Sequence, residues 1–165
     1  MTKTKKVKVG KYYFLIDLAD LKLLKNLSWC AHSKPNGRVY AQAYVRLGKG
    51  IYRNIRMHRL ILGLKIGDKS LGDHINHNTL DNRRCNLRIC TPSQNVTNRR
   101  CFNKNKTSKY RGVSWRKRDK NWDVKVTKNG IHHRLGGFNN EDDAARNYNK
   151  KAKELHGNFA VLNEV

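Results

Sequence analysis

The chain has 165 residues, of which 36 are Lys or Arg and 12 are Asp or Glu, so its formal net charge is +24. This length accommodates one ordinary domain or two small ones. Such a basic surface repels itself and needs a polyanionic partner, for which nucleic acid is the first candidate. A basic membrane-binding protein is the alternative, but no apolar run approaches the roughly 18 residues that a spanning helix needs.

The amino-terminal stretch is basic but has neither the apolar core nor the cleavage site of a signal peptide. We therefore expect a cytoplasmic protein, in the cytoplasm of the host cell if a phage encodes it. Cys30, Cys85, Cys90 and Cys101 are then expected to be reduced thiols rather than disulfides. A structural zinc site is the alternative, which the lack of a paired C-x-x-C motif disfavours.

Short strands and turns are predicted in the first third of the chain. Residues 7–16 resemble a strand, and residues 17–25 have a helical period with Asp17 as a plausible N-cap. Residues 38–45 and 51–57 are rich in β-branched and aromatic side chains and flank a Gly-Lys-Gly turn. They predict a β-hairpin over a small core that contains Trp29.

A short apolar helix is predicted over residues 58–63, and residues 70–100 then predict a strand, a long loop, a strand and a helix. The strands are residues 72–75 and 87–90. Thr91-Pro92-Ser93-Gln94 is a strong helix start, with Thr as N-cap and Pro at the first helical position. Asn95 follows within that helix.

The last third of the chain predicts a separate small unit. Residues 101–109 are polar and read as a linker. Residues 110–116, 122–127 and 131–135 predict three strands, the last two joined by an Asn-Gly turn. Asn140 is a plausible N-cap for a helix that runs to about Leu155 and ends near Gly157.

The segment around Asp73 and His74 supplies parts needed to hydrolyse a phosphodiester. That reaction needs a base for water and a cation that stabilises developing charge. His74 can be the base, because imidazole titrates near neutral pH. Asn95 offers an amide oxygen as a hard ligand suited to Mg²⁺. Neighbouring side chains point to opposite faces of a flat strand, so Asp73 and His74 converge only if the strand bends or a backbone carbonyl contributes.

These residues resemble the HNH endonuclease family, in the HNN variant found among phage homing endonucleases. The match consists of His58-Arg59-Leu60, Asp73-His74-Ile75-Asn76, Asp81-Asn82-Arg83, Asn86-Leu87-Arg88 and Ser93-Gln94-Asn95. The resemblance implies a ββα-metal finger in which Asp73 and Asn95 bind one metal ion, His74 is the general base, and Asn86 hydrogen-bonds within the loop. Asn95 replaces the second histidine of many relatives, which favours Mg²⁺ or Mn²⁺ over zinc.

The other basic residues of this segment each have a simpler alternative role. Arg83, Arg84 and Arg88 could clamp phosphates that flank the cut, or form a solvated basic face. His77 is expected to be a turn residue rather than a ligand. His58 is expected to pack within its helix and is not counted as catalytic.

Alternation in the carboxy-terminal strands predicts two faces. Val113, Trp115, Trp122, Val124, Val126, Ile131, His133 and Leu135 fall on the face that would cover the helix. The outer face is basic and hydrogen-bonding, and a sheet of this kind fits a major groove. Arg111 has the apolar parity, so it needs a bulge, which Gly112 could permit.

This unit resembles the plant ethylene-response-factor (APETALA-type) DNA-binding domain. The match consists of Tyr110-Arg111-Gly112-Val113, Leu135-Gly136 with Phe138, Ala144-Ala145-Arg146 with Tyr148, and Gly157 with Ala160-Val161-Leu162-Asn163. The resemblance implies that the outer face lies on DNA bases through Arg111, Arg116, Arg118, Lys125, Thr127, His132 and Arg134. Ser114 and Arg134 depart from the plant pattern, so base preference does not carry over, and any of the basic contacts could instead be to phosphate.

The sequence therefore predicts an α+β protein with a nuclease domain at residues 1–100, the linker and a DNA-binding domain at 110–165. The expected function is a site-specific DNA endonuclease of homing type that acts on double-stranded DNA with one Mg²⁺ or Mn²⁺. We expect a monomer, whose single finger favours nicking. A non-catalytic DNA-binding regulator and an RNA- or ribosome-binding protein are the alternatives.

Overall fold

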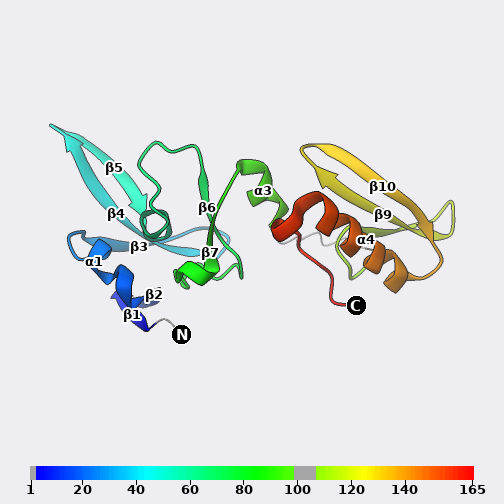
Figure 1. The fold of residues 1–165 in the computed structure, drawn as a ribbon, viewed down its shortest axis with the longest axis horizontal. Helices are drawn as coiled ribbons and strands as arrows, with labels where there is room; N and C mark the ends of the chain where they lie inside the picture. The colour runs from blue at the N-terminus through cyan, green and yellow to red at the C-terminus, as the bar shows by residue number, and fades with distance from the viewer. Residues whose placement is uncertain (1–2, 99–106) are drawn as a thin grey trace. The chain divides into compact units, whose positions relative to one another are not determined.

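The computed structural model describes residues 3–98 and 107–165, and the chain divides into two compact units, Met1–Thr91 and Pro92–Val165. Both units combine small antiparallel sheets with a few helices (Figure 1), so the predicted α+β class is confirmed. Residues 101–106 of the predicted linker, with Cys101, lie outside the described residues. No helix in the described part of the chain has the length and apolar character needed to cross a membrane.

The first unit begins with an antiparallel pair, β1 (Thr4–Val9) and β2 (Tyr12–Asp17). The prediction of one strand over residues 7–16 was wrong, because the chain reverses at Gly10, whose φ of +59° suits glycine. A 3₁₀ turn (Leu18–Asp20) and α1 (Leu21–Leu24) follow. The Asp17 side chain does not cap them: it accepts a hydrogen bond from the Arg84 N–H at 2.8 Å.

The predicted hairpin is confirmed as β4 (Val39–Gly48) and β5 (Ile51–Arg56), and β3 (Trp29–Ser33) adds a third strand beside β4. Trp29 packs against the core, and its indole N–H donates to the Leu24 carbonyl at 3.0 Å. Helix α2 (Met57–Ile61) follows β5 and buries Met57 and Ile61. These two side chains join Phe14 and Ile16 in the core of the first unit, where each buried side chain contributes about 1.5–3 kcal/mol.

The predicted order of strand, loop, strand and helix is observed as β6 (Leu71–His74), a long loop, β7 (Leu87–Cys90) and α3 (Pro92–Thr97). A 3₁₀ turn (Arg84–Asn86) ends the loop. The strands are antiparallel, with Asp73 opposite Arg88 and His74 opposite Leu87. Helix α3 groups with the second unit, because the division falls after Thr91.

The second unit is a three-stranded antiparallel sheet packed on one helix. The strands are β8 (Val113–Arg116), β9 (Asn121–Lys128) and β10 (Ile131–Phe138), with β9 in the middle. Helix α4 (Glu141–His156) packs its alanines and Tyr148 against Val124 and Val126, and a 3₁₀ turn (Gly157–Phe159) follows. Asn140 caps α4 as predicted, accepting from the N–H groups of Asp142 and Asp143.

The burial of three residues of this sheet differs from what the predicted faces suggest. Ile131, at the start of β10, is 64% exposed, and Trp115 is 37% exposed, although its ring packs edge-on against Trp122. Asp123, expected on the outer face, is buried and pairs with Arg116. Trp115 still packs on Trp122 of the same predicted face, and Asp123 still pairs with Arg116 of the outer face, so the burial differs from the prediction while the face does not.

Candidate functional site

Asp73 and His74 occupy the end of β6 and are both buried, with 8% and 6% of their surface exposed. The Asp73 carboxylate accepts a hydrogen bond from Arg88 Nε at 3.0 Å, across the strand pair. The His74 ring contacts His58 and Asn82. The two neighbours therefore have different partners, as expected of successive residues in a strand.

Asn82 orients the His74 imidazole. Its Oδ1 lies 3.0 Å from His74 Nε2, and its Nδ2 donates to the Thr79 carbonyl at 3.5 Å. Because a carbonyl only accepts, this second contact places the amide oxygen toward the imidazole. An amide oxygen at this distance favours the tautomer of the neutral imidazole that has its proton on Nε2 and its lone pair on Nδ1.

Asn82 is not among the residues predicted for the site, although it is only 2% exposed. The loop also contains Asn76, Asn78 and Asn86, and nothing in the sequence distinguishes Asn82 except its place between Asp81 and Arg83. Its contact with His74 joins residues from two ends of a long loop. Only the folded loop reveals that contact.

Asn86 holds this loop closed from within. Its Oδ1 accepts from the Asn76 N–H at 3.0 Å, and its Nδ2 donates to the Asp81 carbonyl at 2.7 Å. The Asn86 carbonyl also accepts from the Ile75 N–H at 2.9 Å, directly after His74. Since the Asn86 side chain is buried, these bonds are costly to break.

The same loop is anchored to β2. The Leu15 N–H donates to the Leu80 carbonyl at 2.8 Å, and the Asn82 N–H donates to the Leu15 carbonyl at 2.7 Å. The Arg84 N–H donates to Asp17, as described above. The loop is thus built into the first unit, which fixes Asn82 beside the imidazole.

His58 packs against the other side of the His74 site. Only 4% of its surface is exposed, and its ring meets that of His74 at 4.9 Å between centroids. Tyr40 lies 5.8 Å from His58 and 6.3 Å from His74. His58 has the packing role that was expected. It packs against the His74 ring, whereas the prediction was packing within its own helix. His77 has a φ of 64°, in agreement with a turn residue.

Burial lowers the pKa of His74 below its ordinary value, an effect that the hydrogen bond to Asn82 and the charges of Asp73 and Asp81 partly offset. Burial also lowers the pKa of His58 well below its ordinary value, and the nearness of His74 adds to this because two protonated rings would repel each other. Both rings are therefore neutral at pH 7. A neutral imidazole can accept a proton, as a general base must.

Each of the three arginines predicted to contact phosphate forms an ion pair in the first unit. Arg83 binds Asp81 at 2.8 and 2.7 Å, which lowers the pKa of Asp81. Arg84 binds Asp20 at 2.7 Å, and Arg88 binds Asp73. The Arg84 side chain stays 56% exposed in its ion pair, and phosphate contact remains a prediction for all three arginines.

The predicted metal ligands fit a hard cation by their donor chemistry. Asp73 offers carboxylate oxygen and Asn95 amide oxygen, which suit Mg²⁺ or Mn²⁺. Arg88 fixes the Asp73 carboxylate through Oδ2. Asn95 lies half-buried on α3 of the second unit. Across residues 3–98 and 107–165, no cluster of three or more His, Cys, Asp or Glu side chains could hold a metal.

Four of the predicted DNA contacts are exposed together on the outer face of β9 and β10. His132 lies opposite Thr127, and Arg134 lies opposite Lys125. His132 Nδ1 and Thr127 Oγ1 are 2.9 Å apart. Two like charges directly across a strand pair repel each other, and an anion placed over them would relieve that repulsion.

The remaining predicted contacts of the second unit have carboxylate or carbonyl partners. Arg116 and Arg118 both bind Asp119, and they hold the pKa of that carboxyl at about 2. Arg111 precedes β8 rather than lying within it, because Gly112 turns the chain with a φ of +71°. The Arg111 guanidinium donates to the Thr97 carbonyl at 2.7 Å.

Comparison with known proteins gives three curated relatives, whereas no protein-family model and no solved structure matches the chain. An uncharacterized HNH endonuclease of Acanthamoeba polyphaga mimivirus is 39% identical over 115 residues, or 67% of this chain and 58% of the relative. Protein 3.8 of Escherichia phage T7 is 35% identical over 88 residues, or 53% of this chain and 71% of that protein. An AP2-like ethylene-responsive transcription factor of Arabidopsis thaliana is 36% identical over 74 residues, or 45% of this chain and 15% of the factor.

The chain therefore shares homology with part of a viral HNH endonuclease and part of a plant transcription factor. It belongs to the same family as Protein 3.8 of phage T7, of which it covers more than two thirds. It spans 58% of the length of the mimivirus relative.

Proposed function

We propose that this protein is an HNH-type DNA endonuclease that hydrolyses a phosphodiester with His74 as general base. The observation that carries the proposal is the His74 imidazole, which is buried, neutral and held through Nε2 by Asn82. The homology to an HNH endonuclease supports a nuclease. The net charge of +24 supports a polyanionic substrate.

In the proposed reaction, Nδ1 of His74 takes a proton from the attacking water as the water oxygen bonds to phosphorus. One P–O ester bond breaks, and solvent protonates the departing oxygen. Asp73 and Asn95 would hold one Mg²⁺ or Mn²⁺, which supplies charge stabilisation at the phosphoryl oxygen when bound. Asn86 and the anchoring of the loop to β2 keep His74 and Asn82 in register.

The outer face of β9 and β10 would bind DNA in this scheme. Lys125 and Arg134 supply positive charge, and Thr127 and His132 supply hydrogen-bonding groups. The homology to a plant transcription factor supports DNA recognition by this unit. We propose a site-specific enzyme of homing type, in which the second unit selects the position and the first cuts.

The test is cleavage of plasmid and phage DNA with Mg²⁺, by the wild type and by His74→Ala and Asn95→Ala. His77→Asn is the matched control, since asparagine tolerates the positive φ of that position. The proposal expects Mg²⁺-dependent cutting, reduced at least about 10²-fold by His74→Ala and unchanged in the control. Cleavage that His74→Ala leaves intact would falsify the mechanism, and DNA binding without cutting in wild type would favour a non-catalytic regulator.

A further inference from the structure

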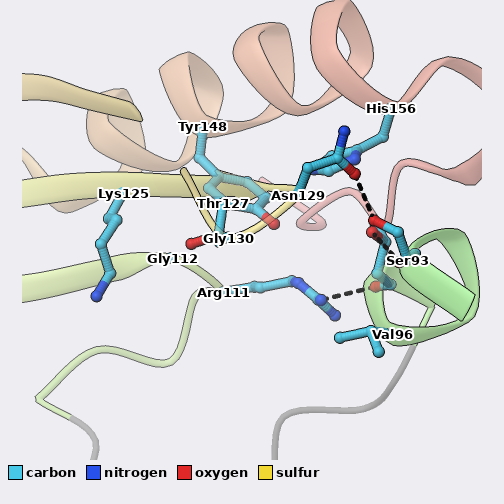
Figure 2. Close-up of a pocket in the computed structure, with 11 residues that line it drawn as sticks. Ser93, Val96, Arg111, Gly112, Lys125, Thr127, Asn129, Gly130, Tyr148 and His156 are labelled. Atoms are coloured by element: carbon cyan, nitrogen blue, oxygen red, sulfur yellow. Dashed lines mark hydrogen bonds between the residues drawn. The ribbon is translucent and has the colours of Figure 1, made fainter. Parts of the chain in front are cut away.

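Helix α3, which carries Asn95, lies against a basic pocket within the second unit. The pocket has a volume of about 480 Å³, and α3 contributes Ser93, Val96 and Thr97 to its lining. Arg111 crosses the pocket toward the helix, and Ser93 lies beside Asn129 (Figure 2).

Hydrogen bonds from other parts of the second unit reach both ends of α3. Ser93 Oγ donates to Asn129 Oδ1 at 2.7 Å, at the turn between β9 and β10. Arg111 Nη2 donates to the carbonyl of Thr97, the last residue of the helix, at 2.7 Å. The last carbonyls of a helix lack intrahelical partners, and a cation there is favourable. A helix of six residues is marginal by itself, so these outside contacts matter to its geometry.

The backbone of Arg111 is itself fixed on both sides. The Asn163 side chain accepts from the Arg111 N–H at 2.7 Å and donates to its carbonyl at 3.2 Å. Asn163 is paired through its own backbone with the Asn149 amide on α4, at 2.7 and 2.9 Å. Asn163, the last residue of the Ala-Val-Leu-Asn sequence, therefore fixes the backbone of Arg111.

Gly112 completes this arrangement. A Cβ at this position would lie 2.2 Å from Tyr148 Cε2 and 2.7 Å from the Lys125 carbonyl, and φ is +71°. Only glycine lets the chain turn so tightly against α4 and β9. The guanidinium of Arg111 therefore projects from a backbone that α4, β9 and Asn163 determine together.

We propose that Arg111 is a positioning residue for α3, and through α3 for the Asn95 amide, rather than a reader of DNA bases. This rests on the proposed function, in which Asn95 binds the metal. It departs from the resemblance to the plant domain, which places the corresponding arginine on DNA. Within the second unit, one guanidinium would then link the residues around the DNA-binding sheet to the helix that bears the proposed metal ligand.

The first measurement is amide hydrogen exchange of the full-length chain without metal or DNA. In Arg111→Ala, the amides of Val96 and Thr97 in α3 and of Asn98 directly after it should exchange about tenfold faster, as expected for the loss of one charge-assisted hydrogen bond. The β9–β10 amides should keep their protection. Lys125→Ala is the matched control, because Lys125 lines the same pocket without contributing to either bond.

The second measurement separates positioning from DNA contact. In metal-free binding, Arg111→Ala should keep wild-type affinity, whereas Lys125→Ala should lose affinity. In cleavage, Arg111→Ala should need several-fold more Mg²⁺ for half-maximal rate, and Arg111→Lys should recover part of the difference. Asn163→Ala, which frees the Arg111 backbone and leaves its guanidinium intact, should change α3 exchange in the same direction.

The proposal is overturned if α3 exchange is the same in Arg111→Ala and wild type, or if Arg111→Ala weakens metal-free DNA binding as much as Lys125→Ala does. Neither amide hydrogen exchange nor metal-free DNA binding depends on cleavage activity. If the wild type cuts no DNA, the proposed function fails, while these two measurements still decide the role of Arg111.

Discussion

The imidazole of His58 meets that of His74 edge-on, with 4.9 Å between ring centroids and 64° between ring planes. His58 comes from α2 and His74 from the end of β6, so this contact ties two elements of the first unit at the proposed base. Gly72, two residues before His74, lies under the His58 ring. The close approach of ring and strand makes the site sensitive to one added methyl group.

Gly72→Ala should destabilise the first unit by about 1–3 kcal/mol, the usual cost of overpacking. A Cβ there would lie 2.6 Å from His58 Cδ2 and 3.1 Å from Leu62 Cδ1. Gly48→Ala is the matched control, because its Cβ would meet nothing nearer than Ile51 Cδ1 at 3.9 Å. Urea unfolding measures the free energy of unfolding of both variants. If Gly72→Ala is as stable as Gly48→Ala, the His58 ring moves aside without loss of stability.

The free energy of unfolding should fall as the pH is lowered from 7 to 5. Burial lowers the pKa of His58 in the folded chain, whereas the unfolded chain titrates near the ordinary value of 6.5. Below that value the unfolded state binds the extra proton, so each pH unit down to the folded pKa costs up to about 1.4 kcal/mol. His58→Phe should reduce the pH dependence of the free energy of unfolding between pH 7 and 5. Above pH 7 the substitution should leave the pH dependence unchanged. His74 contributes in the same direction, so part of the slope should survive, and an unaltered slope in His58→Phe would contradict the expectation.

Asn82→Leu should reduce the cleavage rate by about 10²-fold, because the imidazole loses the acceptor that fixes its tautomer and orientation. It should also cost about 1–3 kcal/mol of stability through the unpaired partners. Asn78→Ala, an exposed asparagine of the same loop, is the control. Plasmid cleavage and unfolding measure the two effects. Asn82→Leu with full activity would mean that His74 needs no partner at Nε2.

Lys125→Ala and Arg134→Ala should each weaken DNA binding and reduce the salt dependence of affinity by a slope of about 1. Each change removes one of two positive charges that face each other across β9 and β10. Lys150→Ala, on the exposed side of α4, should leave the slope unchanged. Fluorescence anisotropy at several salt concentrations measures this. Identical slopes in all variants would move the DNA-binding surface elsewhere.

Local signals along the chain predicted most of the helices and strands. The hairpin of β4 and β5, the strands β6 and β7, the start of α3 at Pro92 and the Asn140 cap of α4 all depend on residues close together in the chain. The prediction of strands failed where one local pattern fits either a single strand or two strands joined by a turn. The basic alternating stretch at residues 7–16 became two strands, because Gly10 permits a reversal that periodicity does not register.

The sequence by itself predicted Asp73, His74, Asn86 and Asn95 as site residues, and it predicted that a second, basic unit follows. Only the tertiary structure decided what touches them. Asn82 meets His74, His58 packs on Gly72, and Asn163 holds Arg111 from 52 residues away. Such contacts depend on how far-apart segments meet when they bury their apolar and polar groups together, and no local spacing records that meeting.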